Sequence, residues 1–230
     1  MIITIDGPGG SGKSTVSRIL ARRLGVPCLN SGYIYRAVTL LVLENGDSFE
    51  DHEAVSKRID GLDLTFREDE DRTRVLIAGR DVTDRLKDPD VTPQVFKIAN
   101  DSHYRKLLVE LQRRCALPRG VVAEGRDMGT VIFPGADHKF YLDASAEERA
   151  RRQHRDLVRK GHPKPFEEVY AEVVRRDAHD SDRAAAPLRV PEGATVIDTD
   201  ARSVAEVVEL IWSTIASKEP QLRAEASKHA

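Results

Sequence analysis

Short apolar runs and longer amphipathic stretches alternate along most of the chain. Apolar, β-branched runs predict short buried strands at residues 2–5, 28–30, 120–124, 139–142 and 194–197. Apolar positions repeating every three or four residues predict helices at residues 15–24, 33–44, 51–59, 91–99, 103–115, 146–160, 166–180 and 204–215. Such alternation predicts an α/β fold with helices flanking a parallel core sheet. We expect ligands at the C-terminal ends of its strands.

One segment breaks this alternation. Residues 62–66 and 74–77 follow a strand-like alternating pattern around a charged turn, and residues 79–82 suggest a third short strand. We therefore predict a small antiparallel sheet inserted into the parallel core. The expected plan is a single domain with a core of residues 1–32, 117–145 and 190–217, an insert at about 33–116, a lid at about 146–165 and a polar tail at 218–230.

Composition narrows the class of protein. The chain has 230 residues, 40% hydrophobic and 32% charged, with a formal net charge of −2. These values are typical of a globular protein with one sizeable core and give no overall attraction to nucleic acid or membrane. The longest apolar run, residues 37–43 with Thr39 inside it, is too short to span a bilayer. We expect the first residues to form a strand and not a signal peptide. Cys28 and Cys115 show neither metal-binding spacing nor a disulfide framework. We expect a cytoplasmic enzyme.

A glycine-rich motif follows the first predicted strand. It reads Gly7-Pro8-Gly9-Gly10-Ser11-Gly12-Lys13-Ser14 and fits G-x-x-x-x-G-K-[ST] at every fixed position. Strand, loop and helix follow one another as this phosphate-binding loop requires, with Thr15 in the helix that begins after it. Backbone N–H groups and the helix N-terminus would hold a polyphosphate, Lys13 would reach its β- and γ-phosphates, and the Ser14 hydroxyl would bind Mg²⁺. The motif predicts that the protein binds a nucleoside triphosphate with Mg²⁺.

Two arginines lie at the predicted ligand edge of the sheet. Arg36 is in the helix after residues 28–32, and Arg126 comes directly after the strand that ends at Glu124. Guanidinium groups bind phosphate with two hydrogen bonds and keep their charge, which suits a second anion beside the triphosphate. The alternative is that each arginine makes a surface ion pair.

The two charged helices carry further candidates. Arg149, Arg152, Arg155 and Arg159 share one helical face and precede the loop 161–165, an arrangement typical of a lid that closes over phosphates. Acidic residues four positions away make a solvated, salt-bridged face an equal alternative. The next helix places Arg176, Asp180 and Arg183 on one face, and Arg105 is a lone candidate on an earlier helix.

Several separated segments carry a family resemblance in one order. They are Ile5-Asp6-Gly7-Pro8, Ser31-Gly32 with Ile34-Tyr35-Arg36, Glu124-Gly125-Arg126-Asp127-Met128-Gly129-Thr130-Val131, Glu148-Arg149-Ala150, and Arg183-Ala184 with Ala186-Pro187-Leu188. From about Ile2 to Ser217 the chain resembles the bacterial cytidylate kinase family. The antiparallel insert is similar to the enlarged monophosphate-binding region of the family's long form.

This resemblance implies a P-loop kinase fold with an Arg-rich lid and transfer of the ATP γ-phosphoryl group to CMP or dCMP. It implies a catalytic role for Lys13, Arg36, Arg126 and the lid arginine Arg152, with Arg149 on the ATP side. Arg36 and Arg126 would hold the acceptor phosphate. Cytosine would be read by Arg105, Asp127 and Arg183, and the pentose would face Arg176 and Asp180 with Ser31 nearby. The expected partners are these small-molecule substrates, and a monomer is expected.

The chain departs from the family pattern at three places. Asn30 stands where many members have Asp, Leu86-Lys87-Asp88 replaces a common Ile-Arg-Thr, and Phe96 falls where a base-contacting Ser is expected. These differences bear on how the pyrimidine is selected.

Two alternative functions remain open on the sequence. One is a kinase for another small acceptor, such as UMP, AMP or an alcohol, for which Asp6 could serve as a base. The other is a P-loop switch or ATP-dependent binding module. The chain has no Asn-Lys-x-Asp guanine-reading motif and no long basic surface for nucleic acid, which disfavours the switch.

Overall fold

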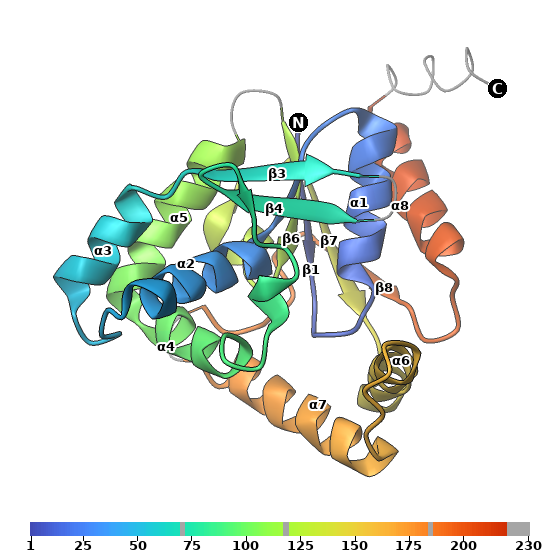
Figure 1. Cartoon of the computed structure of the whole chain (residues 1–230). Helices are drawn as coiled ribbons and strands as arrows, with labels where there is room; N and C mark the ends of the chain where they lie inside the picture. The colour runs from blue at the N-terminus through green and yellow to red at the C-terminus, as the bar shows by residue number, and fades with distance from the viewer. Residues whose placement is uncertain (70–71, 117–119, 184–185, 220–230) are drawn as a thin grey trace.

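A five-stranded parallel sheet forms the centre of the protein (Figure 1). The structure is a computed structural model that describes residues 1–69, 72–116, 120–183 and 186–219. In sheet order the strands are β2 (Cys28–Asn30), β6 (Val121–Gly125), β1 (Ile2–Asp6), β7 (His138–Asp143) and β8 (Thr195–Asp198). Neighbouring strands pair in parallel, so their C-terminal ends share one edge. The predicted fold class and all five predicted core strands are confirmed.

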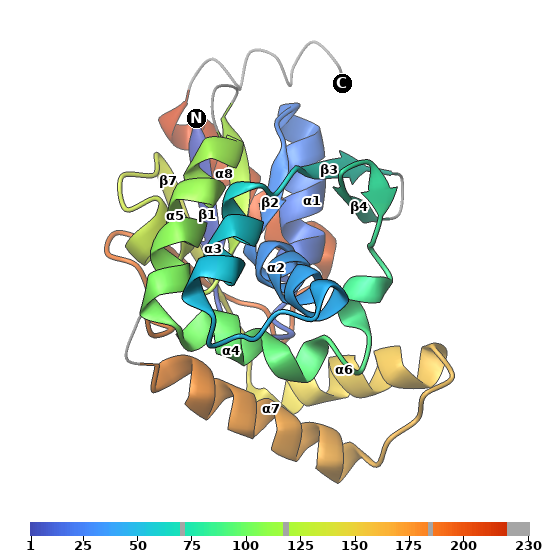
Figure 2. The same cartoon turned by 60° about the vertical axis from the view of Figure 1, so that its left-hand side comes forward.

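Helices cover both faces of this sheet because its strands are apolar on both sides. On one face lie α1 (Lys13–Leu24) and α8 (Val204–Lys218), whose Leu20 and Ile211 are buried with Ile3 and Ile5 of β1. On the other lie α2 (Ser31–Asn45), α3 (His52–Asp60) and α5 (Ser102–Ala116), which share a core with β2 and β6. Figure 2 shows α2, α3 and α5 side by side on this face.

The predicted antiparallel insert is present as a second, smaller sheet. Its strands are β3 (Leu64–Glu68), β4 (Thr73–Ile77) and β5 (Arg80–Asp81). The sheet packs against α2 through a cluster that includes Leu40, Val75 and Leu86. Ala78 and Gly79 join β4 to β5 with φ values of 48° and 80°. After the 3₁₀ turn Arg85–Lys87, the predicted helix 91–99 is divided into a 3₁₀ turn, Thr92–Gln94, and α4 (Val95–Asn100).

Two helices lie across the C-terminal ends of the strands. They are α6 (Ala146–Arg159) and α7 (Phe166–Ser181), which run below the sheet in Figures 1 and 2. Their apolar contacts are with each other, since Ala150, Val169 and Val173 form a separate buried cluster. We call residues 146–181 the lid hairpin.

Two features differ from the sequence-based expectation. Residues 128–132 after β6 form a π-helical turn, which the apolar pattern did not indicate. The polar tail was expected from residue 218, but α8 extends to Lys218, and residues 220–230 lie outside the described residues. Neither Cys28 nor Cys115 forms a disulfide bond within the described residues. Within the described ranges, every helix is too short or too polar to cross a membrane.

Candidate active site

The phosphate loop connects β1 to α1 at the shared C-terminal edge of the sheet. Gly7 approaches β7 so closely that a β-carbon on it would lie 2.1 Å from the Leu142 carbonyl oxygen, so no larger residue fits. Inside the loop, Nζ of Lys13 donates to the Pro8 carbonyl at 2.7 Å. The whole predicted motif, Gly7, Pro8, Gly9, Gly10, Ser11, Gly12, Lys13 and Ser14, therefore lies in one loop and the first turn of α1.

Lys13 is buried in this loop, with 5% of its surface exposed. Burial, and then the positive charge of Arg126, lower the pKa of its ammonium to about 7. The lysine is therefore held where an anion would restore its charge.

Ser14 begins α1 beside a carboxylate that the motif did not predict. Its Oγ donates to Oε1 of Glu124 at 2.6 Å, and the Asn30 side-chain amide also donates to that oxygen. The Ser14 hydroxyl and the Glu124 carboxylate are possible oxygen ligands at the phosphate-binding edge. Mg²⁺ prefers one or two protein oxygens together with substrate phosphates and water. The residues present therefore fit Mg²⁺. Thr15 follows on α1 and is exposed.

Two arginines border the loop. A β-carbon on Gly9 would lie 3.1 Å from Nη2 of Arg126 and 3.4 Å from Cζ of Arg176. Nε of Arg126 donates to Asp180 at 2.8 Å, whereas Arg176 has no hydrogen bond or ion pair within the described part of the chain. The surrounding protein, and then Arg126, lower the pKa of Arg176 to about 10. Positive charge is thus concentrated beside the phosphate loop.

A second cluster lies behind these arginines. Asp127 is 4% exposed and forms a buried salt bridge with Arg105, which also donates to the Ala99 carbonyl at 3.2 Å. Burial raises the pKa of the Asp127 carboxyl, whereas Arg105 and Arg183 act in the opposite direction. Nη2 of Arg183 donates to Asp180 at 2.7 Å, and its Nε has no hydrogen bond among the described residues.

Asp180 links the two clusters, because it accepts from both Arg126 and Arg183. Burial favours its neutral form, but the two arginines outweigh burial and hold its pKa below the usual range. The structure thus brings together three separate stretches of the sequence: Arg105, Arg126 with Asp127, and Arg176 with Asp180 and Arg183.

Arg36 and Ser31 stand on α2 at the border of these clusters. Nη1 of Arg36 donates to the Leu86 carbonyl at 2.9 Å and to Thr92 Oγ1 at 2.8 Å. Burial lowers the pKa of Arg36, and its charge acts on Arg176. Ser31 is buried, and its Oγ would lie 2.5 Å from a β-carbon on Gly125, so only glycine fits there. Phe96 is 50% exposed on α4.

The four arginines on the shared face of α6 divide into two pairs. Arg149 is buried and donates to the Gly9 carbonyl at 3.1 Å and to Asp177 Oδ1 at 2.9 Å. Arg152 donates to Thr199 Oγ1 at 3.1 Å and to the Gly10 carbonyl at 3.5 Å. Arg155 and Arg159 are exposed and pair with acidic residues on α6. Arg149 and Arg152 thus contact the phosphate loop, whereas Arg155 and Arg159 form surface ion pairs, and the lid role of the first two stays a prediction.

Asp6, considered as a base for an alcohol acceptor, is fully enclosed by the π-helical turn. Its two oxygens accept from the N–H groups of Met128 at 2.7 Å and Gly129 at 2.8 Å. Burial raises its pKa to about 6, although the two N–H groups lower it. Both oxygens accept hydrogen bonds from backbone N–H groups, so Asp6 stabilises the turn after β6 and is not placed to act as a base.

Sequence reasoning missed four residues that touch this site: Glu124, Asp177, Thr199 and the Tyr35 hydroxyl. Glu124 and Tyr35 lie inside the segments that resemble the family, so their position beside the predicted site residues Arg126 and Arg36 could have identified them. The Tyr35 hydroxyl is buried without a hydrogen bond among the described residues. Asp177 and Thr199 had no sequence signal, because their partners are distant in the chain.

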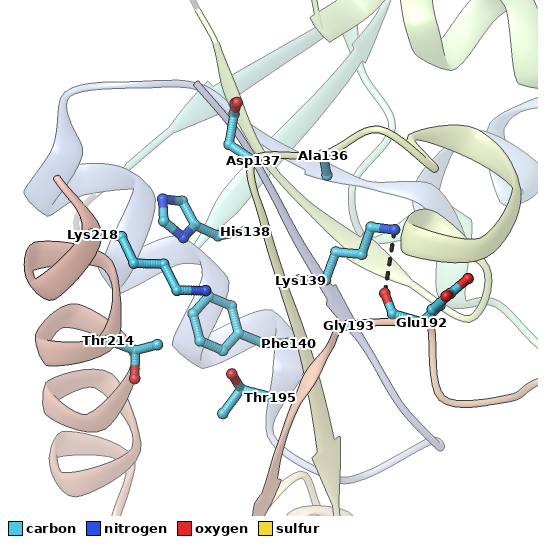
Figure 3. Close-up of a pocket in the computed structure, with 10 residues that line it drawn as sticks. All are labelled: Ala136, Asp137, His138, Lys139, Phe140, Glu192, Gly193, Thr195, Thr214 and Lys218. Carbon is cyan, nitrogen blue, oxygen red and sulfur yellow. Dashed lines mark hydrogen bonds between the residues drawn. The ribbon is translucent and has the colours of Figure 1, made fainter.

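A cavity of about 180 Å³ lies at the other end of the sheet, between the starts of β7 and β8 and the end of α8 (Figure 3). Buried His138 and the exposed Lys218 line it. Nε2 of His138 is 3.5 Å from Oε1 of Glu219. The cavity is at the N-terminal end of β7 and therefore does not belong to the phosphate-binding edge.

The comparisons with known proteins agree with this geometry. The family model for cytidylate kinase matches residues 3–217. Cytidylate kinase of Carboxydothermus hydrogenoformans is 44% identical over 95% of this chain and 98% of its own length. The enzyme of Vibrio cholerae is 41% identical over 94% and 96%. An uncharacterised protein of Eubacterium ventriosum has a similar fold, with a TM-score of 0.51 at 13% identity, covering 94% of this chain and 98% of its own. The chain belongs to the cytidylate kinase family, whose members phosphorylate CMP or dCMP with ATP.

Proposed function

We propose that the site holds its two substrates on either side of Gly9. The phosphate loop, with Lys13, Ser14 and Thr15, would hold the ATP phosphates, and Arg149 would act on the ATP side. The acceptor phosphate would bind Arg126 and Arg36, with Arg176 and Asp180 facing the pentose and Ser31 nearby. The observation that carries this arrangement is the position of Arg126 and Arg176 against Gly9. A second anion is thereby attracted to the side of the loop.

The chemistry requires positioning and charge rather than a general base. A nucleoside monophosphate already presents an anionic oxygen, so the main obstacle is repulsion between two phosphates. Lys13, Arg126 and Arg152 would screen that repulsion in an in-line transfer. Asp6 has both oxygens occupied, which disfavours an alcohol acceptor.

Mg²⁺ is the proposed cofactor. The Ser14 hydroxyl would bind it, and Glu124 would orient that hydroxyl and accept from metal-bound water. Bound Mg²⁺ supplies charge neutralisation between the β- and γ-phosphates.

The lid, first expected at about 146–165, is proposed to comprise the whole lid hairpin. Closure over the phosphates would exclude water and prevent ATP hydrolysis. We also propose a monomer acting in the cytoplasm, where nucleotides are supplied as substrates.

Asp127, Arg105 and Arg183 are proposed to read cytosine. Cytosine offers an amino donor beside ring acceptors, whereas uracil presents a carbonyl and an N–H. A carboxylate at Asp127 accepts from the amino group but repels the uracil carbonyl. Sites built on such pairing reject the wrong partner by up to ~10⁴-fold, because unpaired buried polar groups are costly.

The proposal is tested with Asp127→Asn, assayed by ADP release for CMP, dCMP, UMP and AMP. An amide can donate to the uracil carbonyl, so the ratio of kcat/KM for CMP over UMP should fall by about tenfold or more. Asp127→Ala should lower activity on CMP much more than on UMP. These variants also disturb the salt bridge to Arg105, so folding is checked by circular dichroism.

Asp177→Asn is the matched control, because Asp177 pairs with Arg149 on the proposed ATP side, and it should leave the CMP to UMP ratio unchanged. Equal losses for both pyrimidines in Asp127→Asn would show that Asp127 orients the arginines and does not read the base. A wild-type preference for UMP or AMP would overturn the acceptor assignment.

A further inference from the structure

We propose that Thr199 is a positioning residue that holds Arg152 in place for phosphoryl transfer. The inference rests on the role proposed above for Arg152. Thr199 lies directly after β8, outside every motif of the sequence, and is 3% exposed.

Thr199 connects three elements of the site edge. Its N–H donates to the Asp143 carbonyl at the end of β7, at 2.8 Å. Its hydroxyl lies 3.0 Å from that same carbonyl oxygen and 3.3 Å from the Ser11 carbonyl oxygen in the phosphate loop. Residue 199 is thereby fixed to the strand and to the loop at once.

Arg152 of α6 binds to this fixed point through two atoms. Its Nη1 donates to the Thr199 hydroxyl at 3.1 Å, and its Nη2 donates to the Thr199 carbonyl at 2.5 Å. A hydroxyl has one proton to give to a carbonyl and lone pairs to accept from a guanidinium, so these contacts are compatible. The orientation of the guanidinium is therefore set by Thr199 as well as by α6.

Arg155, one turn further along α6, gives a contrast. The Arg155 side chain is 68% exposed and, among the described residues, pairs with Glu148 alone, at 3.4 Å. Arg152 also pairs with Glu148, at 3.0 Å, but its side chain is 24% exposed and its Nη1 lies 3.5 Å from the Gly10 carbonyl. Fixing an arginine side chain costs conformational entropy. Because Thr199 already holds Arg152 in the folded protein, that entropy is lost on folding and not in the catalytic step.

The test compares Thr199→Val, which replaces the hydroxyl with a methyl group, with Thr199→Ser, which keeps it. Loss of one orienting hydrogen bond should lower kcat by about fivefold in Thr199→Val. The KM for CMP should stay within about twofold, because Arg152 is not proposed to hold the acceptor. Thr199→Ser should restore kcat to near the wild-type value.

A double-mutant cycle with Arg152→Ala separates positioning from general packing. In the Arg152→Ala background, Thr199→Val should change kcat by less than about twofold. Each variant is assayed well below its measured Tm. Lower stability of Thr199→Val with unchanged kcat would mean a merely structural role and would overturn the proposal.

Two further outcomes are distinguishable. If Arg152→Ala lowers kcat and Thr199→Val lowers it by an independent, multiplying factor, Thr199 does not act through Arg152 and only the positioning proposal fails. If Arg152→Ala keeps the wild-type kcat, the role proposed for Arg152 fails first and Thr199 has nothing to position.

Discussion

Lys13 combines burial with a cluster of positive charge, and its pKa falls to about 7 as a result. At pH 8 a group with that pKa is neutral in about nine-tenths of the molecules. A bound triphosphate favours the charged ammonium and raises the pKa again. Triphosphate binding should therefore take up a proton at pH 8.

This uptake is measurable by calorimetry. A non-hydrolysable ATP analogue with Mg²⁺ is titrated into the enzyme in two buffers with different ionisation enthalpies. We expect uptake of about 0.5 to 1 proton at pH 8 and much less at pH 6, where Lys13 is already charged. Lys13→Arg stays charged throughout and should show no such pH dependence. Equal uptake by Lys13→Arg would assign the proton to another group.

The positions of single residues were predictable where one sequence motif contains both the residue and the secondary-structure elements that place it. Lys13 and Ser14 follow from the strand, loop and helix around them. Glu124 was quoted in a motif, but its contact with Ser14 exists only because β6 lies between β1 and β2 in the sheet. Arg149 and Arg155 looked alike on the helical face, and only the packing of α6 against the phosphate loop separates them.

At the scale of elements, the turn between β4 and β5 contains a strained residue. Ala78 has a φ of 48° and is exposed, and the following Gly79 has a φ of 80°. Two-residue turns with positive φ at both positions favour Asn followed by Gly, because Asn tolerates the left-handed region better than Ala.

Ala78→Asn should therefore stabilise the protein by about 0.5–1 kcal/mol, which corresponds to a rise of about 1–4 °C in Tm. Thermal unfolding followed by circular dichroism measures the change. Gly79→Ala is the opposite control and should lower Tm, because its φ is positive and alanine is strained there. A lower Tm in Ala78→Asn would show that the side chain at residue 78 makes contacts worth more than the relief of strain.

Elements with a long, regular pattern were the most predictable. All five core strands, the antiparallel insert and both charged helices occur where the apolar pattern places them. The division near residues 92–95 was not predicted, although Pro93 lacks the N–H that continues a helix. The π-helical turn was also missed, since it depends on Asp6, more than 120 residues earlier in the chain.

At the scale of the whole molecule, a small net charge coexists with a local concentration of basic side chains. The net charge is only −2, yet Lys13, Arg126 and Arg176 gather at one edge of the sheet. Composition could not reveal this, because the sheet order that brings the groups together is a property of the fold.

The lid hairpin should become more protected from hydrogen exchange when phosphates bind at that edge of the sheet. A bisubstrate analogue, two nucleosides joined by a polyphosphate, should slow amide hydrogen exchange across residues 146–181, as new phosphate contacts restrict both helices. Exchange in α8, far from the phosphates, should stay unchanged and serves as the internal control. Unchanged exchange in α6 would mean that the lid hairpin does not close over the phosphates.

The separate apolar cluster of the lid hairpin also determines how easily that hairpin unfolds locally. Ala150, Val169 and Val173 form a cluster separate from the main core, whereas hydrogen bonds connect the hairpin to the phosphate loop and to Arg126 after β6. Little apolar surface would be exposed if the two helices separated from the sheet, so the free-energy cost of local unfolding there is small compared with that of the core. The enzyme can thus lose its lid on warming while the parallel sheet stays folded, and its activity would fall at a temperature below its global melting point.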